Sequence, residues 1–331
     1  MTTAVLVRSV CTNTNSVINL IGSNFRIGVL SVQPQKLVQK RCVATKSDVD
    51  ATIKEYKEGN FEKLPDPDKL THFRKQKQEN VTQKVEVPKE PLPMGATALP
   101  HPIWSEEELH NVHITHKPPE GKVDKMAYFT VKTVRRAFDL VSGFTWGERN
   151  EYKWLNRIIF LETVAGVPGM VAAMTRHLHS LRRMQRDYGW IHTLLEEAEN
   201  ERMHLMTALQ LKQPSRKFKW CVIGTQGVFV GMFSVWYLFS PRFCHRFVGY
   251  LEEEAVKTYT KCLEDIESGN LQHWKTKPSP EVAISYWNLP EDATMKDVIL
   301  AIRADEAHHR LVNHTLASMK PTDYNPYKPG K

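Results

Sequence analysis

Apolar side chains recur at helical spacing through the second half of this chain. From about Lys153 onward such stretches follow one another, and Pro and Ser residues separate them at positions 213–215, 240–241 and 278–280. No stretch of alternating apolar and polar residues, the pattern of a half-buried strand, competes with them. The pattern therefore predicts an all-α protein whose helical domain spans residues 153–331.

The longest apolar stretch within this domain is residues 220–241, which are 22 consecutive uncharged residues. This length is enough for a helix to cross a bilayer. Lys217 precedes the stretch and Arg242 follows it, so the flanking charge selects no orientation. Whether the stretch crosses a membrane depends on which side chains before and after it must meet.

The N-terminal third of the chain differs in composition from the helical domain. Residues 1–47 contain six Lys or Arg and no acid, the composition of a mitochondrial transit peptide, with a plain basic tail and a plastid address as alternatives. Residues 48–95 are rich in Lys, Glu, Gln, Asp and Pro, which predicts a flexible polar linker. Residues 96–152 are interpreted as an N-terminal arm that includes a first membrane-associated or dimer-forming region.

Charge and cysteine content exclude two classes of protein. The formal net charge is +8, but the basic leader accounts for most of it, and the nearly neutral remainder gives no electrostatic basis for nucleic-acid binding. The five cysteines form no CxxC pair, and their number is odd. This pattern argues against a secreted disulfide scaffold and against a cysteine zinc site.

The pattern Glu-x-x-His occurs three times, and a chain of this composition contains about one by chance. The pairs are Glu107 with His110, Glu201 with His204, and Glu306 with His309. The first lies in the polar arm, beside three further histidines that could bind a metal but more plainly belong to a surface segment. The other two lie on helical stretches, where a spacing of three places both side chains on one face.

Two single glutamates complete a set of metal ligands. Glu162 stands in the apolar stretch 158–166, where an unpaired ionised carboxylate is rarely tolerated. Among three consecutive glutamates, Glu252 shares its helical face with no charged residue, whereas the faces of the next two include Lys257. Glu252 is therefore expected to be the glutamate of this group that points inward.

In chain order, a single Glu is followed by Glu-x-x-His, and this order then repeats. The repeat is the ligand pattern of ferritin-like di-iron four-helix bundles. Four buried glutamates satisfied by Arg or by hydrogen bonds are the structural alternative. Carboxylate oxygens with two imidazoles suit iron or manganese.

The ligand pattern also bears on the apolar stretch 220–241. If this stretch crossed a bilayer, Glu201 and Glu252 would emerge on opposite sides and could not share a metal site. The stretch is therefore predicted to lie in one leaflet, which makes the protein monotopic. A cluster of arginines could form a basic rim for anionic headgroups, or simply a solvated helix face. These are Arg176, Arg182, Arg183 and Arg186.

Four segments resemble the signature motifs of the alternative oxidases, the cyanide-insensitive ubiquinol oxidases of mitochondria. They are Leu161-Glu162-Thr163 and residues 200–205, 251–255 and 303–309. The resemblance covers about residues 100–326. It implies two non-haem iron ions per chain and the reduction of dioxygen to water by two ubiquinols without proton pumping. It further implies a homodimer on the matrix face of the mitochondrial inner membrane, where the monotopic protein would contact the lipids of one leaflet.

The resemblance assigns roles to single residues. It implies six metal ligands: Glu162, Glu201, His204, Glu252, Glu306 and His309. It implies a redox-active Tyr259, which by itself would be read as a core tyrosine. It implies a ubiquinol pocket of Arg135, Asp139, Arg157, Leu161, Glu254, Ala255 and Thr258. It implies supporting residues around the ligands: Asn200, Tyr286, Trp287 and Asp305.

One feature departs from the plant members of this family, which carry a regulatory cysteine in the arm. No cysteine lies between Cys42 and Trp220, so control by a disulfide and keto acids is not expected. Four other functions share parts of the pattern. They are a plastid plastoquinol oxidase, a quinone-ring hydroxylase, an iron-storing ferritin relative and a membrane scaffold with a structural metal.

Overall fold

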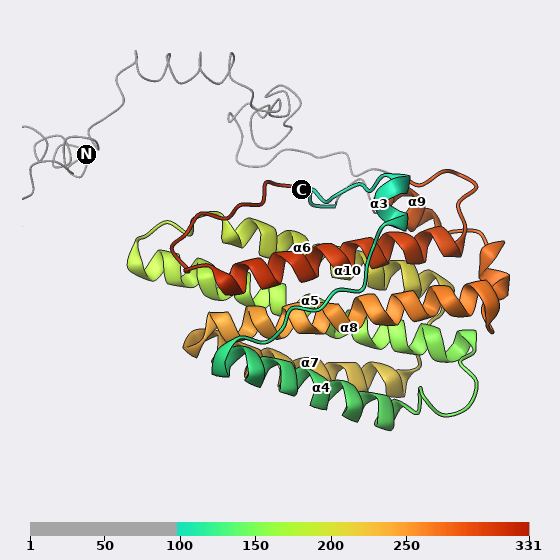
Figure 1. Ribbon diagram of the computed structural model, residues 1–331, viewed down its shortest axis with the longest axis horizontal. Coiled ribbons are helices and arrows are strands. Elements are labelled where there is room, and N and C mark those ends of the chain that lie inside the picture. Colours follow the sequence, from blue (N-terminus) through green and yellow to red (C-terminus); the bar gives the residue numbers. More distant parts are fainter. Residues whose placement is uncertain (1–97, 331) are drawn as a thin grey trace, which may run out of the picture. The chain divides into compact units, whose positions relative to one another are not determined.

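The structure of the chain, a computed structural model, describes residues 98–330 (Figure 1). These residues form helices and connecting segments, and within this range the only β-type contact is a single bridge between Pro278 and Thr294. The all-α class predicted from the sequence is confirmed. The proposed transit peptide, 1–47, and the proposed linker, 48–95, lie outside the described residues.

Four long helices form the bundle that carries all the predicted metal ligands. Helix α5 packs against α6, and α8 packs against α10 (Figure 1). The four are α5 (Glu151–Arg183), α6 (Trp190–Leu211), α8 (Pro241–Ser268) and α10 (Met295–Ser318). The described chain also contains three short elements: α3 (Glu106–His110), the 3-10 helix η2 (Gln272–Lys275) and α9 (Glu281–Trp287).

Two further helices lie along the bundle, and both are drawn on its lower side in Figure 1. Helix α7 (Arg216–Phe239) packs against α5, and α4 (Gly121–Ser142) packs against α8. Residues 96–152 were interpreted as an arm with a first membrane-associated or dimer-forming region, but no helix was predicted before residue 153, so α4 was not predicted as a helix. A helical signal was present, because Ala127 and Val131 are spaced by four and are buried.

Serine side chains cap the N-termini of two helices at the positions where the sequence predicted breaks between helices. The Ser215 hydroxyl accepts a hydrogen bond from the Phe218 N–H at the start of α7, and Ser240 accepts one from the Phe243 N–H at the start of α8. Such caps satisfy an N–H group that lacks an intrahelical partner. Helix α5 continues through Pro168 and ends at Arg183, and the residue that caps it, Met184, has a left-handed φ of 50°.

Both α5 and α7 are long and apolar enough to cross a membrane by length and composition alone. Half of the apolar window of α5 is buried, as expected for a core helix of a bundle, but only 11% of the window of α7 is buried. Trp220, Val228 and Phe239 are among the exposed side chains of α7. Helix α7 thus presents apolar surface that the rest of the described chain does not cover.

The bundle contains two clusters of buried apolar side chains. One includes Trp154, Ile159 and Ile299, and the other includes Trp190 and Val312. On α5, for example, Ile159 belongs to the first cluster and Val167 to the second, and the predicted ligand Glu162 falls between them. The carboxylates therefore lie deep in the bundle between two apolar regions.

The close approach of α5 to α6 gives a stability prediction. A Cβ on Gly169 would lie 2.6 Å from the Leu194 carbonyl oxygen and 3.2 Å from the Ala198 Cβ. We expect Gly169→Ala to reduce stability by about 1–3 kcal/mol because backbone must move. Gly227 is a matched control, since a Cβ there meets nothing within 4 Å. Thermal unfolding in detergent should show a lower Tm for the first variant only, and equal Tm values would contradict this packing.

Candidate metal centre

The six predicted ligands lie together inside the bundle, and each of the four long helices contributes at least one. Helix α5 supplies Glu162, α6 supplies Glu201 and His204, α8 supplies Glu252, and α10 supplies Glu306 and His309. All six are buried, with at most 5% of each residue exposed. On α6 and α10 the Glu and His are three residues apart, so one helical face directs both inward.

The six side chains form two overlapping groups of four. The first contains Glu162 and His204, the second contains Glu252 and His309, and both include Glu201 and Glu306. Within each group, one possible ligand atom per residue lies within 4.8 Å of all the others. Two cations could therefore lie side by side, with the two shared carboxylates bridging them.

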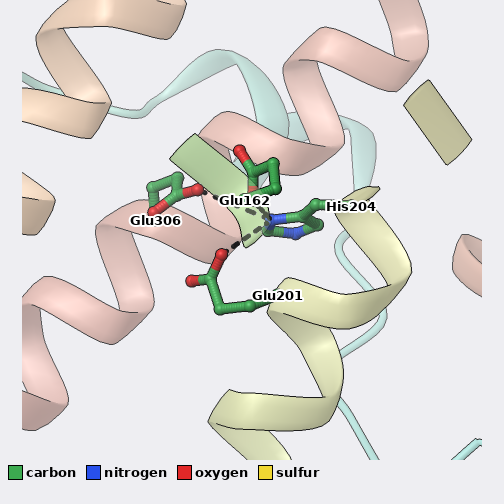
Figure 2. A group of neighbouring side chains, drawn as sticks. All are labelled: Glu162, Glu201, His204 and Glu306. Atoms are coloured by element: carbon green, nitrogen blue, oxygen red, sulfur yellow. Dashed lines mark ion pairs between the residues drawn. The ribbon is translucent and has the colours of Figure 1, made fainter. Parts of the chain in front are cut away.

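The atoms that face one another fit a bound cation better than they fit hydrogen bonding. The His204 Nδ1 atom lies 3.3 Å from Glu162 Oε2 and 3.5 Å from an oxygen of Glu201, and Figure 2 shows the carboxylates arranged around this ring. His309 Nδ1 lies 2.8 Å from Glu201 Oε1. Within the described chain, both Nδ1 atoms and the Oε2 atoms of Glu162 and Glu201 are buried without a hydrogen-bond partner. Buried polar atoms of this kind are costly unless a ligand satisfies them.

Burial and mutual repulsion set the proton affinities of the cluster. Burial and the nearby charge of Glu201 raise the pKa of Glu162 to about 8, and burial with Glu306 raises the pKa of Glu252 well above its usual value. Although burial lowers the pKa of His309, its contact with Glu201 raises it to about 9. Without a cation the cluster holds extra protons, and a divalent cation would replace them.

Asp305 orients His204 from outside the cluster. Its Oδ2 lies 3.0 Å from His204 Nε2 and also accepts hydrogen bonds from the Trp287 ring N–H and the Asn200 amide. Burial raises the pKa of Asp305, but the contact with His204 outweighs this and leaves the pKa lowered. An ionised Asp305 holds a proton on His204 Nε2, which directs the unprotonated Nδ1 atom at the metal positions.

The N-terminal arm also contributes to this support. The Trp104 ring N–H donates to Asp305 Oδ1 at 2.6 Å. His101 stacks on Tyr286 with ring centroids 3.7 Å apart, and the Tyr286 hydroxyl accepts a hydrogen bond from the Asn200 amide. The sequence did not indicate this role of Trp104, because nothing local to the arm points to a partner 201 residues away.

A second buried polar chain, missed from the sequence, supports the His309 side. The Asn313 amide donates to both oxygens of Glu197 at 2.9 Å and to the His309 carbonyl at 3.1 Å. The Asn313 oxygen therefore faces His245 Nδ1, and His245 Nε2 accepts from the Tyr237 hydroxyl. Burial lowers the pKa of His245 to about 4, so this ring is neutral. The signal available in the sequence was spacing, since Glu197 and Asn313 each lie four residues from a ligand.

Tyr259 contacts the centre directly. Its hydroxyl donates a hydrogen bond to Glu162 Oε1. Burial and the charge of Glu162 raise the pKa of Tyr259 well above its usual value, so the phenol stays protonated. Tyr259 lies on α8, the helix that also carries Glu254, Ala255 and Thr258 of the residues assigned to ubiquinol.

The residues assigned to a ubiquinol pocket meet where α4, α5 and α8 come together. Asp139 lies between Arg135, at 2.9 Å, and Arg157, at 2.7 Å. Arg135 also donates to the Glu254 carbonyl, which accepts from the Thr258 hydroxyl as well. Burial and the neighbouring Arg135 lower the pKa of Arg157 to about 10. The two apolar members of the set, Leu161 on α5 and Ala255 on α8, are half-buried.

The prediction that Glu252 alone points inward from its group was wrong. Glu253 is also buried, on another side of α8, where it accepts from the Lys117 N–H and contacts His116 at 2.7 Å and His314 at 2.9 Å. Lys257 was the reason to expect Glu253 to be exposed, but it binds Glu254 instead. Long-range partners decided this burial, and helical spacing does not reveal them.

Two other groups from the sequence, the arm histidines and the predicted basic rim, do not form the arrangements that were considered for them. His110 pairs with Glu106 on the surface, so the described arm histidines form no metal cluster of their own. Arg176 is bound to Asp187 at 2.6 Å and lies over the Trp190 ring. It is therefore engaged within the protein, whereas the other three arginines of the predicted rim, 182, 183 and 186, are exposed.

Comparison with known proteins gives a single family. A family model for alternative oxidase matches residues 104–318. The chain is 51% identical over 243 residues to the mitochondrial alternative oxidase of Emericella nidulans, covering 70% of this chain and 69% of that protein. It is 56% identical over 218 residues to that of Trypanosoma brucei brucei, covering 66% of each. It is 48% identical over 250 residues to that of Neurospora crassa, covering 70% and 69%.

Proposed function

Since this chain belongs to the alternative oxidase family, we propose that its buried carboxylate and histidine cluster is the di-iron centre of a ubiquinol oxidase. The chain is an oxidoreductase that takes electrons from ubiquinol and passes them to dioxygen. Oxidation of two ubiquinols supplies the four electrons and four protons that convert one dioxygen into two waters. The four protons released by the quinols equal the four consumed in forming water, and the proposed reaction pumps none.

The observation that carries the proposed centre is the pair of overlapping four-residue groups that share Glu201 and Glu306. Each group would hold one iron ion through three carboxylates and one imidazole, a donor set that suits iron. Two bound iron ions would supply the redox chemistry that reduces dioxygen. The protein would fix the ligands, since Asp305 holds His204 and Asn313 supports the helix turn at His309.

Ubiquinol would bind beside Asp139 on α4 and Arg157 on α5, and Arg157 precedes Glu162 by five residues, about 1.4 helical turns. Arg157 is buried and lies over the rings of Phe138 and Phe144, so its guanidinium is held in place and its planar fork could orient a quinol oxygen. The nearby carboxylates of Asp139 and Glu254 could accept the quinol protons. Tyr259 would then connect this pocket to the centre through its hydrogen bond to Glu162.

The apolar surface of α4 and α7 would bind one leaflet of the mitochondrial inner membrane from the matrix side. Phe129 and Leu140 on α4 and Val228 on α7 are each at least 60% exposed. Helix α4 also carries Arg135 and Asp139, so a membrane at this surface would deliver ubiquinol to its pocket. The relatives are mitochondrial by name, which supports the organelle and the proposed leader.

A homodimer would cover a second apolar stripe. On α5, Met170, Met174, Leu178 and Leu181 are exposed at spacings of three and four, so they share one face. A symmetric contact through this face would bury side chains that are otherwise exposed to water.

Membrane association through α7 gives a direct prediction. We expect Val228→Glu to weaken binding to vesicles at least about tenfold, because burying a Val side chain contributes about 1.5–3 kcal/mol and a charge opposes insertion. Leu311 on α10 is 57% exposed, against 63% for Val228, so Leu311→Glu is a matched control. Vesicle flotation measures both. Equal binding by the two variants would show that α7 is not part of the membrane-binding surface.

Oxygen uptake tests the function itself. Membranes that contain the protein should consume oxygen with a short-chain ubiquinol as donor when cyanide is present, and the purified chain should contain about two iron ions. Stoichiometric hydroxylated quinone as product would instead indicate a hydroxylase, and iron without uptake would indicate a structural metal. A chain that binds no iron would exclude the proposed centre.

A further inference from the structure

A small cavity of about 30 Å³ lies between α6 and α10, beside residues 101–102 of the arm, and several polar side chains line it. A space of this size holds one or two water molecules if polar partners are present. None of the side chains assigned to ubiquinol lines it, since those side chains belong to α4, α5 and α8. The cavity is therefore separate from the proposed route of the quinol.

The inner end of the cavity reaches the metal centre. His309, a proposed ligand, forms part of its wall together with the buried side chains of Glu197, Asn200 and Asp305. The Asn200 amide nitrogen donates to Tyr286 and Asp305, but its Oδ1 atom is buried without a hydrogen-bond partner in the described chain. A carbonyl oxygen left in this way requires a donor, and a water molecule in the cavity would supply one.

The outer end of the cavity reaches the surface through half-buried polar side chains. Glu196 and His308 line it there, and Glu196 accepts a hydrogen bond from the Gly330 N–H of the C-terminal segment. The imidazole of His308 has two ring nitrogens that can hydrogen-bond to water. The lining of one cavity thus includes both a proposed iron ligand and half-buried polar side chains. Val312 and Pro102 are the apolar members of the lining.

We propose that this cavity holds ordered water and is the route by which product water leaves the metal centre. The inference rests on the proposed function, which forms two waters for each dioxygen at a site between two apolar clusters. The quinol pocket offers a poor exit for water, because bound quinol and the adjacent membrane would block it. A chain of polar side chains provides successive hydrogen bonds for a leaving water molecule.

Narrowing the cavity tests the proposal. Val312→Leu adds one methylene group to the lining, and Val171→Leu is a matched control, because Val171 is a buried valine of the same apolar cluster that does not line the cavity. We expect Val312→Leu to lower kcat about tenfold, because slow product release limits turnover, with KM for ubiquinol unchanged. In the Val312→Leu variant, radiolytic labelling of His308 in water enriched in ¹⁸O should fall about threefold relative to wild type, because bound water is displaced.

The outcomes separate this proposal from the proposed function. Wild-type protein without cyanide-resistant uptake would refute the function, whereas normal wild-type turnover with an unaffected Val312→Leu variant would refute only the exit. Reduced labelling with normal kcat would also overturn the exit, because the water would then be merely structural. If Val312→Leu fails to fold, Glu196→Leu places an apolar side chain at the mouth, with Glu196→Gln as control. Equal kcat for these two would overturn the proposal.

Discussion

Replacing Glu201 with Ala is expected to remove iron and oxidase activity together. Glu201 is the only residue on α6 that belongs to both four-residue groups, so its loss deprives both metal positions of a carboxylate. It also leaves His309 Nδ1 without the oxygen that lies 2.8 Å away. We expect iron content to fall below about a tenth of the wild-type value and uptake to reach background, because metal binding requires the complete ligand set.

The same helix offers a matched control for this variant. Glu199 lies two residues before Glu201 but pairs with Arg202 near the surface. Glu199→Ala should therefore retain iron and turnover. Iron analysis of both proteins, with circular dichroism as a check on folding, measures the prediction. An active, iron-replete Glu201→Ala protein would remove Glu201 from the ligand set and would leave the bridging arrangement without support.

The second large effect is expected from Tyr259→Phe, which should lose turnover while retaining iron. The substitution preserves the ring and its packing and removes only the hydroxyl that donates to Glu162. If this hydroxyl passes a proton or an electron between the ubiquinol pocket and the centre, its loss should lower kcat by about 10²–10⁴-fold. The KM for ubiquinol should change little, since the hydroxyl contacts a ligand of the centre.

Tyr250 provides the control for this experiment. It lies on the same helix and is 1% exposed, but its hydroxyl is buried without a hydrogen-bond partner in the described chain. Tyr250→Phe should therefore leave iron content and kcat unchanged. Steady-state oxygen uptake with iron analysis distinguishes the two variants. Full turnover in Tyr259→Phe would reduce Tyr259 to a packing residue.

The N-terminal arm contacts a residue that supports the proposed metal centre. Trp104 donates to Asp305, which orients His204, so a segment outside the four long helices helps to set the geometry of one metal position. Arg303 strengthens the attachment by donating to the Leu109 carbonyl from α10. The Pro-rich and charged composition of the arm suggested only a surface extension. The structure shows that the arm also supports a proposed metal ligand through Asp305.

The sequence by itself determined the class of the protein and its ligand pattern. Helical periodicity predicted an all-α chain, which the structure confirms over the described residues. A spacing of three residues along a helix is a local property, so the pairing of Glu201 with His204 and of Glu306 with His309 could be predicted before any packing was known. The apolar neighbours of Glu162 likewise marked it as a buried carboxylate.

Only the tertiary structure decided which side chains surround that pattern. Trp104 and Asp305 are 201 residues apart, and Glu253 is buried by partners on the arm and on α10. Periodicity identifies the face of a helix, but the partner of that face depends on how distant helices pack, which local spacing does not encode. For the same reason the cavity between α6 and α10 became visible only once both helices were in place.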